Sequence, residues 1–161
     1  MAIERKILTA TALSTWREQL RREGKRLVVT NGCFDILHLG HVTYLENARA
    51  LGDALLVGVN SDSTVRELKG PTRPINSERE RAAILAALEA VDAASIFNEL
   101  RATSFLERIR PDIYVKGGDY TLETICQEER RLLEQMGAKI VILPVVHGKS
   151  TTTLLEKIAQ R

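Results

Sequence analysis

The sequence predicts an α/β fold in which a five-stranded parallel sheet lies between two layers of helices. Short apolar runs typical of strands alternate with longer amphipathic runs typical of helices from residue 27 onward. This alternation indicates βαβ units, whose right-handed crossovers place helices on both faces of a sheet. Residues 54–60 form a nearly continuous apolar run, as expected of a strand covered on both faces. We therefore expect one domain, residues 1–161, with a Rossmann-like three-layer αβα sandwich.

Local signals place the individual elements. Leu13, Trp16 and Leu20 share one face of a first helix, and Gly24 is suited to end it. Ser77 with Glu80 is typical of a capping box at a helix start. Strands are expected at residues 27–30, 54–60, 91–97, 113–116 and 139–143. Helices are expected at residues 11–23, 38–51, 61–68, 77–90, 103–110, 122–136 and 151–160.

Composition excludes several classes of function. The 161 residues are 44% hydrophobic and 27% charged, with a formal net charge of +2, so no basic stripe for nucleic acid is indicated. We find no signal peptide and no apolar run long enough to span a membrane. Cys33 and Cys126 belong to no CxxC pair, which argues against a zinc site or disulfide framework and favours the cytoplasm.

Residues 30–41, TNGCFDILHLGH, follow the first strand and open the next helix. A helix start offers unpaired N–H groups and the positive end of the helix dipole, which together attract anions. Gly32 and Gly40 let the backbone approach a ligand closely, and His38 and His41 are three residues apart on one helix face. The stretch therefore predicts a nucleotide phosphate site that is used for chemistry.

Further polar residues follow the other predicted strands. Because the carboxyl ends of parallel strands meet at one sheet edge, these residues are expected near the histidines. Lys116 precedes two glycines at a strand end, from where its ammonium group can reach a phosphate. Residues 69–76 must form a loop because they contain two prolines and a glycine, and Lys69 and Arg73 make this loop a candidate lid.

The chain resembles the cytidylyltransferase-like nucleotidyltransferase family over roughly residues 26–160. The family is marked by HxGH after the first strand, which here is His38 to His41. Within it, the resemblance is strongest to the adenylyltransferases that form ADP-heptose for lipopolysaccharide, in a stand-alone form without the fused sugar kinase. That closer likeness is carried by four stretches: VNSD (59–62), RPIN (73–76), VKGGDY (115–120) and GKSTT (148–152).

The resemblance implies transfer of AMP from ATP to D-glycero-β-D-manno-heptose 1-phosphate, with pyrophosphate leaving. The implied catalytic residues are His38, His41 and Lys116. The residues implied to bind the nucleotide are Asn31, Gly32, Cys33, Phe34, Gly40, Arg81, Gly117, Asp119, Ser150 and Thr151. The residues implied to bind the acceptor are Asp35, Asn60, Asp62, Lys69 and Arg73. Mg²⁺ is expected to bind through the ATP phosphates, so no protein ligand is assigned to it.

Simpler roles stay open for several of these residues. Ser150 and Thr151 begin a helix, so they are expected to cap it whether or not they also bind phosphate. Arg81 lies in a charged helix, where an arginine is usually solvated. Asp35 can orient a histidine, bind a sugar or ribose hydroxyl, or simply stabilise a turn. Cys33 is expected to be a small buried filler beside the site.

Other functions also stay open. Cytidylyltransferases of the family tend to carry an arginine and a glutamate just before the last glycine, whereas this chain has VVH at 145–147. That difference favours adenine, but transfer of CMP to glycerol phosphate, or of AMP to another phosphorylated acceptor, remains an alternative. A non-catalytic nucleotide-binding module is a second alternative. Expected partners are ATP, a sugar 1-phosphate and a separate sugar kinase, and a homodimer through the Trp16 helix is left open.

Overall fold

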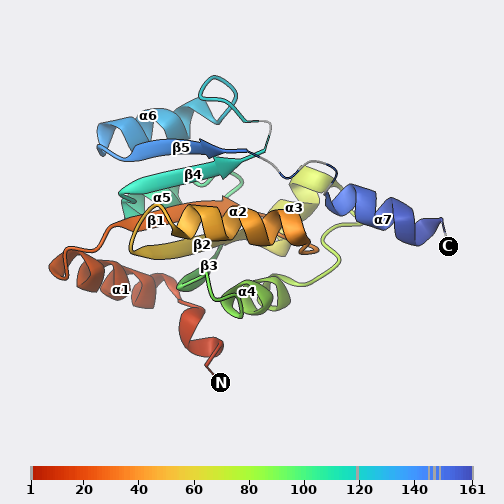
Figure 1. Cartoon of the computed structure of the whole chain (residues 1–161), viewed down its shortest axis with the longest axis horizontal. Coiled ribbons are helices and arrows are strands. Elements are labelled where there is room, and N and C mark those ends of the chain that lie inside the picture. The colour runs from red at the N-terminus through yellow and green to blue at the C-terminus, as the bar shows by residue number, and fades with distance from the viewer. Residues whose placement is uncertain (1, 119, 145, 147, 149, 161) are drawn as a thin grey trace.

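The computed structural model of the chain describes residues 2–118, 120–144, 146, 148 and 150–160. Its strands are β1 (Leu27–Gly32), β2 (Ala54–Asn60), β3 (Ala93–Phe97), β4 (Ile113–Gly117) and β5 (Lys139–Leu143). They form one parallel sheet in the order β3-β2-β1-β4-β5 (Figure 1). The predicted α/β class and the five-stranded parallel sheet are therefore confirmed.

The helices lie close to where the sequence placed them, and serine side chains cap three of them. Ser61, Ser77 and Ser150 each accept a hydrogen bond from the backbone N–H three residues further on, and Ser77 forms the predicted capping box with Glu80. The helices are η1 (Glu4–Lys6), α1 (Ala10–Arg22), α2 (Leu39–Arg49), α3 (Asp62–Lys69), α4 (Glu78–Ala86), α5 (Thr103–Ile109), α6 (Gln127–Gln135) and α7 (Thr151–Ala159).

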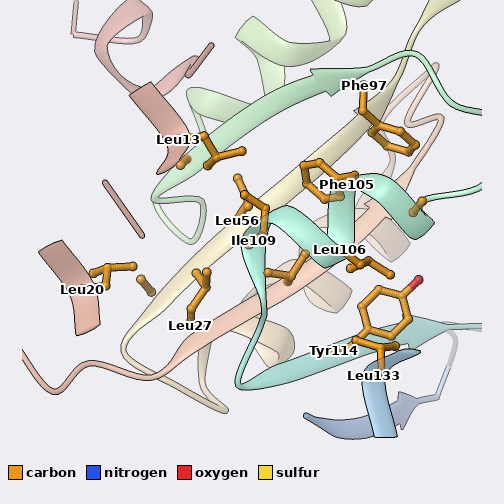
Figure 2. Packing of buried hydrophobic residues seen from close by; sticks show 14 residues of the cluster. Leu13, Leu20, Leu27, Leu56, Phe97, Phe105, Leu106, Ile109, Tyr114 and Leu133 are labelled. Atoms are coloured by element: carbon orange, nitrogen blue, oxygen red, sulfur yellow. The ribbon is translucent and has the colours of Figure 1, made fainter. Parts of the chain in front are cut away.

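Successive side chains along each strand pack alternately into two separate hydrophobic cores, one on each face of the sheet. Val29 and Tyr114 belong to the core that α1, α5 and α6 cover, which Figure 2 shows. Val28 and Val115 belong to the opposite core, under α2 and α4. In a pleated strand, successive side chains point to opposite faces of the sheet. Residues two apart on a strand therefore contact the same layer of helices. The predicted three-layer sandwich is confirmed.

Helix α1 is an integral part of the first core. Leu13 and Leu20 are buried there, and each fully buried leucine contributes about 1.5–3 kcal/mol. Arg17 is also buried on this helix, although an arginine in a helix with many charges is usually solvated. Its Nε donates to the carbonyl of Ile109 at 3.1 Å, and its Nη2 lies 3.1 Å from Asp112 Oδ2. The arginine thus supplies a donor to the carboxyl end of α5, which accounts for its burial.

Two helices are shorter than predicted. Contacts with a residue distant in the sequence accompany the early end of one, and hydrogen bonds within a turn precede the late start of the other. Helix α4 ends at Ala86 rather than near residue 90, and the carbonyl of Val91 accepts a hydrogen bond from Lys6 at 2.8 Å. Helix α6 begins at Gln127 rather than at residue 122, because the hydroxyls of Thr121 and Thr124 bond to the backbone of residues 121–124. Within the described ranges, no helix combines the length and apolarity needed to cross a bilayer.

Candidate active site at the ends of β1 and β4

The candidate site lies where β1 and β4 separate. Their ladder pairing ends at Val29 and Tyr114, whereas β1 stays paired with β2 up to Gly32 and β4 stays paired with β5 up to Gly117. The strand order reverses at this point, so a crevice opens beyond the carboxyl ends of the two central strands. A cavity of about 780 Å³ occupies the crevice.

Most of the residues that the sequence singled out line this cavity. They are Asn31, Gly32, Cys33, Phe34, Asp35, His38, Gly40, His41, Asn60, Lys69, Arg73, Lys116, Gly117, Ser150 and Thr151. Asp62 and Arg81 do not line it, and Asp119 lies outside the described residues. The fold thus brings together side chains from the ends of three strands, the start of α2, the loop before α4 and the start of α7.

Two stacked histidines lie at the start of α2. His38 immediately precedes the helix and His41 lies in its first turn, with 3.9 Å between their ring centroids and 26° between their planes. Burial, together with the nearby His38, lowers the pKa of His41 from 6.5 to about 4. Across the described part of the chain, the buried Nδ1 of His41 has no hydrogen-bond partner. His41 is therefore a neutral imidazole at pH 7 with an unused nitrogen.

Phe34 holds the turn before the histidines in an unusual conformation. Its φ is +47°, in the left-handed region that residues other than glycine seldom occupy. The Phe34 ring packs 5.4 Å from the His41 ring, and a Cβ added to Gly32 would come within 3.0 Å of it. The glycine therefore makes room for an aromatic ring that supports the histidine, a role that no local pattern reveals.

Lys116 enters the cavity from the end of β4. Its Nζ lies 5.6 Å from the ring centroids of both Tyr114 and Tyr120. Burial lowers the pKa of Lys116 below its ordinary value of 10.5, while Glu129 acts in the opposite direction. Behind the lysine, Gly117 must lack a side chain because an added Cβ would lie 2.6 Å from the ring of Tyr44. The ammonium group is thus partly buried and lies near two aromatic rings within the crevice.

Asp35 fastens the loop before α4 to the histidine turn. Its side chain is 1% exposed and accepts hydrogen bonds from Arg73 Nε at 2.6 Å and from the N–H groups of Ile75 and Asn76 at 2.8 and 3.0 Å. Burial raises the pKa of Asp35, but these donors more than offset that effect and hold the pKa below its ordinary value. Of the roles left open for Asp35, the geometry favours a clamp over a contact with a sugar hydroxyl.

Arg81 departs most clearly from its predicted place. It was expected either near a triphosphate or in solvent, yet its side chain is 0% exposed. The guanidinium donates to the carbonyls of Asn76 and Cys33 at 3.0 and 2.6 Å and to Asp62 Oδ1 at 2.8 Å. These bonds join α4 to the turn after β1 and to the start of α3, and neither Arg81 nor Asp62 lines the cavity.

The start of α7 also lines the cavity. Ser150 caps the helix by accepting a hydrogen bond from Thr153 N at 3.0 Å, which confirms the simpler of its two predicted roles. The Thr151 hydroxyl donates to the carbonyl of Ile36 at 3.2 Å and so links the helix to the histidine turn. The N-terminus of a second helix is thereby directed at the same space as that of α2.

Several lining residues were not predicted. Glu129 is buried on α6 and lines the cavity. It lies four residues before Leu133 and therefore on the same helix face, and this spacing was the one sign in the sequence that Glu129 faces inward. Arg101 and Cys126 line the cavity as well, with 2.9 Å between Arg101 Nη1 and Cys126 Sγ. The remaining lining residues that were not predicted are Tyr44, Leu68, Leu100, Gly118, Tyr120, Pro144, Val146 and Thr152. Val146 lies in the stretch that was expected to distinguish adenine from cytosine; Val145 and His147 are outside the described residues.

No group of three or more His, Cys, Asp or Glu side chains among the described residues is arranged to hold a metal ion. Of the residues that the structure describes, the cationic side chains at the cavity are Lys69, Arg73, Arg101 and Lys116. With two helix starts, they make a strongly anion-attracting space in which the buried carboxylates of Asp35 and Glu129 are already engaged by hydrogen bonds. The arrangement suits a polyphosphate, and among the side chains that the structure describes no nucleophile has an activating base beside it.

Residues 29–156 match the model of the family described as cytidylyltransferase-like. The Bifunctional protein HldE of Pseudomonas aeruginosa is 49% identical over 158 residues, which are 98% of this chain and 33% of HldE. HldE of Syntrophotalea carbinolica is 49% identical over 156 residues, which are 97% of this chain and 31% of that protein. The chain therefore spans about a third of the length of these curated relatives.

Two solved structures are also similar. The lipopolysaccharide core biosynthesis protein of Thermoplasma volcanium is 34% identical with a TM-score of 0.63, and the match covers 76% of this chain and 98% of that one. A pantoate-beta-alanine ligase of Francisella tularensis, crystallised with an ATP analogue and beta-alanine, has a TM-score of 0.56 at 13% identity. The match covers 96% of this chain and 79% of the ligase, and at that identity it shows a shared fold alone.

Proposed function

This chain belongs to the cytidylyltransferase-like family of nucleotidyltransferases, and we propose that it transfers AMP from ATP to D-glycero-β-D-manno-heptose 1-phosphate. The observation that carries the choice of acceptor is the 49% identity to HldE over 98% of this chain. The likeness to a lipopolysaccharide core biosynthesis protein supports the same assignment. The products would be ADP-heptose and pyrophosphate.

The proposed chemistry is one in-line displacement. An oxygen of the sugar phosphate attacks the α-phosphorus of ATP, the bond from that phosphorus to the bridging oxygen breaks, and pyrophosphate leaves with the electron pair. The protein needs no nucleophile of its own, so positioning and electrostatic stabilisation supply the catalysis. This requirement agrees with a cavity that is rich in cations and helix starts.

We assign each part of the displacement to residues of the cavity. His38 and His41, with the N-terminus of α2, stabilise charge on the α- and β-phosphates, and Lys116 reaches the same phosphates from β4. The start of α7 faces the β- and γ-phosphates. Lys69 is the last residue of α3, where the sequence had predicted a loop, and Arg73 is on the loop that Asp35 holds. From these positions the two side chains can neutralise the leaving pyrophosphate or the acceptor phosphate. ATP is proposed to enter as its Mg²⁺ complex, with the ion held by phosphates and water.

The acceptor and the base are tested together. We expect the purified chain with Mg²⁺ to release pyrophosphate from ATP only when heptose 1-phosphate is present, and ³¹P NMR to show a new diphosphate ester. CTP is expected to react at least tenfold more slowly, which agrees with Val146 at the cavity wall. Faster reaction with CTP and glycerol 3-phosphate would indicate the alternative transferase, and ATP binding without turnover would indicate a binding module. The acceptor itself must come from a sugar kinase reaction.

A further inference from the structure

A buried tyrosine joins the two strand ends of the crevice from behind. Tyr114 on β4 is fully buried, and its hydroxyl donates to Asn31 Oδ1 on β1 at 2.7 Å. The same hydroxyl lies 3.3 Å from Glu129 Oε2 on α6. Asn31 and Glu129 line the cavity, whereas Tyr114 does not. Tyr114 therefore can act on a bound ligand only through a neighbour.

The hydrogen bond determines which end of the Asn31 amide is left for a ligand. An asparagine side chain presents an acceptor oxygen at one end and an NH₂ donor at the other. A tyrosine hydroxyl has one proton, and the 2.7 Å contact places it on Asn31 rather than on Glu129 at 3.3 Å. With Oδ1 of Asn31 engaged, Nδ2 is the group left to donate.

We propose that Tyr114 is a positioning residue that orients Asn31 so that its Nδ2 donates to a phosphate oxygen of the bound nucleotide. Asn31 follows the paired residue Val29 on the same strand face, and Lys116 follows Tyr114 in the same way on β4. The amide and the ammonium group thus lie on the two strands that bound the crevice. Together they present donors to an anion from both sides of it.

The surroundings of Asn31 leave this orientation little freedom. A Cβ added to the neighbouring Gly58 would lie 3.2 Å from Asn31 Cβ and 2.8 Å from the ring of Phe105, so the base of the Asn31 side chain is closely packed. Glu129 Oε1 accepts a hydrogen bond from Ala102 N at 2.7 Å, which fixes the competing carboxylate. Burial and Glu129 raise the pKa of Tyr114 well above 10, so the hydroxyl remains a donor.

Tyr114→Phe is the appropriate variant because it removes only the hydroxyl and keeps the ring that packs in the core and lies near Lys116. The dissociation constant of ATP·Mg²⁺ is measured by calorimetry for the wild type, Tyr114→Phe, Asn31→Ala and the double variant. We expect Tyr114→Phe to weaken binding by roughly fivefold to tenfold, as for loss of one hydrogen bond. In the Asn31→Ala background we expect it to have no further effect. Fold-changes that multiply would overturn the inference.

Tyr44→Phe is the matched control. Tyr44 is a partly buried tyrosine that lines the cavity, but its hydroxyl bonds to Thr30 and to the carbonyl of Val115. Its effect on ATP binding, whatever its size, is expected to be the same with and without Asn31. Thermal unfolding of each variant separates a loss of folded protein from a loss of affinity. A Tyr114→Phe protein that is less stable but binds ATP normally would show a structural role and contradict the proposal.

The inference rests on nucleotide binding and not on the identity of the acceptor. If the wild type binds ATP but forms no ADP-heptose, the proposed acceptor is wrong and the binding cycle still tests Tyr114. When turnover is present, Tyr114→Phe is expected to raise the KM for ATP and leave the KM for the acceptor unchanged. A wild-type chain that does not bind ATP·Mg²⁺ would overturn both proposals.

Discussion

The imidazole rings of His38 and His41 stack at 3.9 Å between centroids, directly before and within the first turn of α2. At this separation, two imidazolium cations would repel each other strongly, and the low pKa of His41 reflects that repulsion after the larger effect of burial. In the free protein at neutral pH, His41 is therefore uncharged. A bound anion would favour its imidazolium form.

His41→Ala tests the catalytic assignment. Loss of one donor to charge that develops in a transition state typically costs on the order of 10²–10³ in rate, about 3–4 kcal/mol. We expect kcat to fall in this range while the circular dichroism spectrum and thermal midpoint change little, because His41 is half-buried at the cavity edge. Turnover within a few-fold of wild type would remove His41 from the mechanism.

The protonation of His41 is expected to follow the ligand. In the free protein, its NMR titration should have a midpoint near pH 4, and ATP·Mg²⁺ should raise this midpoint because phosphate favours the imidazolium form. Proton uptake on binding means that ATP affinity rises as the pH falls from 7 toward the free-protein pKa. An unchanged midpoint with ATP bound would show that no phosphate contacts this ring.

The same pKa predicts how stability depends on pH. The folded-state pKa of His41 lies below the ordinary 6.5, so the unfolded chain binds more protons between about pH 4 and 6.5. The free energy of unfolding should therefore rise with pH across this window, by about 2–3 kcal/mol from this group, and level off above it. Urea unfolding of wild type and His41→Ala at several pH values isolates the contribution, because the variant lacks that part of the slope.

Asp35→Asn should release the loop before α4. The two carboxylate oxygens of Asp35 accept hydrogen bonds from Arg73 and from the N–H groups of Ile75 and Asn76. The substitution removes the negative charge that pairs with Arg73. It also replaces one of these acceptor oxygens with an NH₂ group, which can only donate. We expect the free energy of unfolding to fall by about 2–4 kcal/mol, as when one partner of a buried charged network is lost. The KM of the substrate whose phosphate Arg73 contacts should also rise.

Asp53→Asn provides the comparison for Asp35. Asp53 accepts one backbone hydrogen bond and lies 3.8 Å from Arg26, but both side chains are exposed, so a change of under about 1 kcal/mol is expected. Chemical denaturation measures both variants. Equal losses for the two aspartates would show that the clamp adds nothing beyond an ordinary surface contact.

Arg17→Met tests whether α1 is anchored by its buried arginine. The variant keeps much of the aliphatic volume but leaves the carbonyls of Ile109 and Arg110, and the Asp112 carboxylate, without this donor. A loss of about 2–4 kcal/mol is expected, reduced from that of a fully buried pair because Asp112 is partly exposed. Arg22→Ala on the same helix breaks a pair in which Arg22 is 79% exposed, and it should cost less than about 1 kcal/mol.

Much of the fold and part of the site could be predicted because they follow from local pattern. The alternation of apolar runs predicted the parallel sheet, and the carboxyl ends of its strands necessarily brought Asn31, Asn60 and Lys116 to the histidines. What the sequence did not reveal depends on contacts between distant residues. The left-handed φ of Phe34 and the packing of its ring against that of His41 were not predicted either, because no residue pattern in this turn indicates them.

Charged residues show this limit most clearly. Arg17 and Arg81 both lie in helices with many charges, where solvent is the usual environment, yet both are buried. Their acceptors are carbonyls at Ile109 and Cys33, which are 92 and 48 residues away. Glu129 and Tyr114, which are 15 residues apart, meet in the same way at the cavity wall. A partner that no local spacing specifies cannot be inferred from one sequence.

The early end of pairing between β1 and β4 also bears on how the chain folds. As the chain leaves the ribosome, β1, β2 and β3 can form half of the sheet, with β1 as a temporary edge strand. Strand β4, which follows β3 in the sequence, must then pair with β1 at the opposite edge, and β5 adds to β4. The seam that closes last has only two paired positions, Val28 with Ile113 and Val29 with Tyr114. A nucleotide bound across its open end would bridge the two halves. We therefore expect ATP to slow hydrogen exchange at the β1–β4 seam more than elsewhere in the sheet.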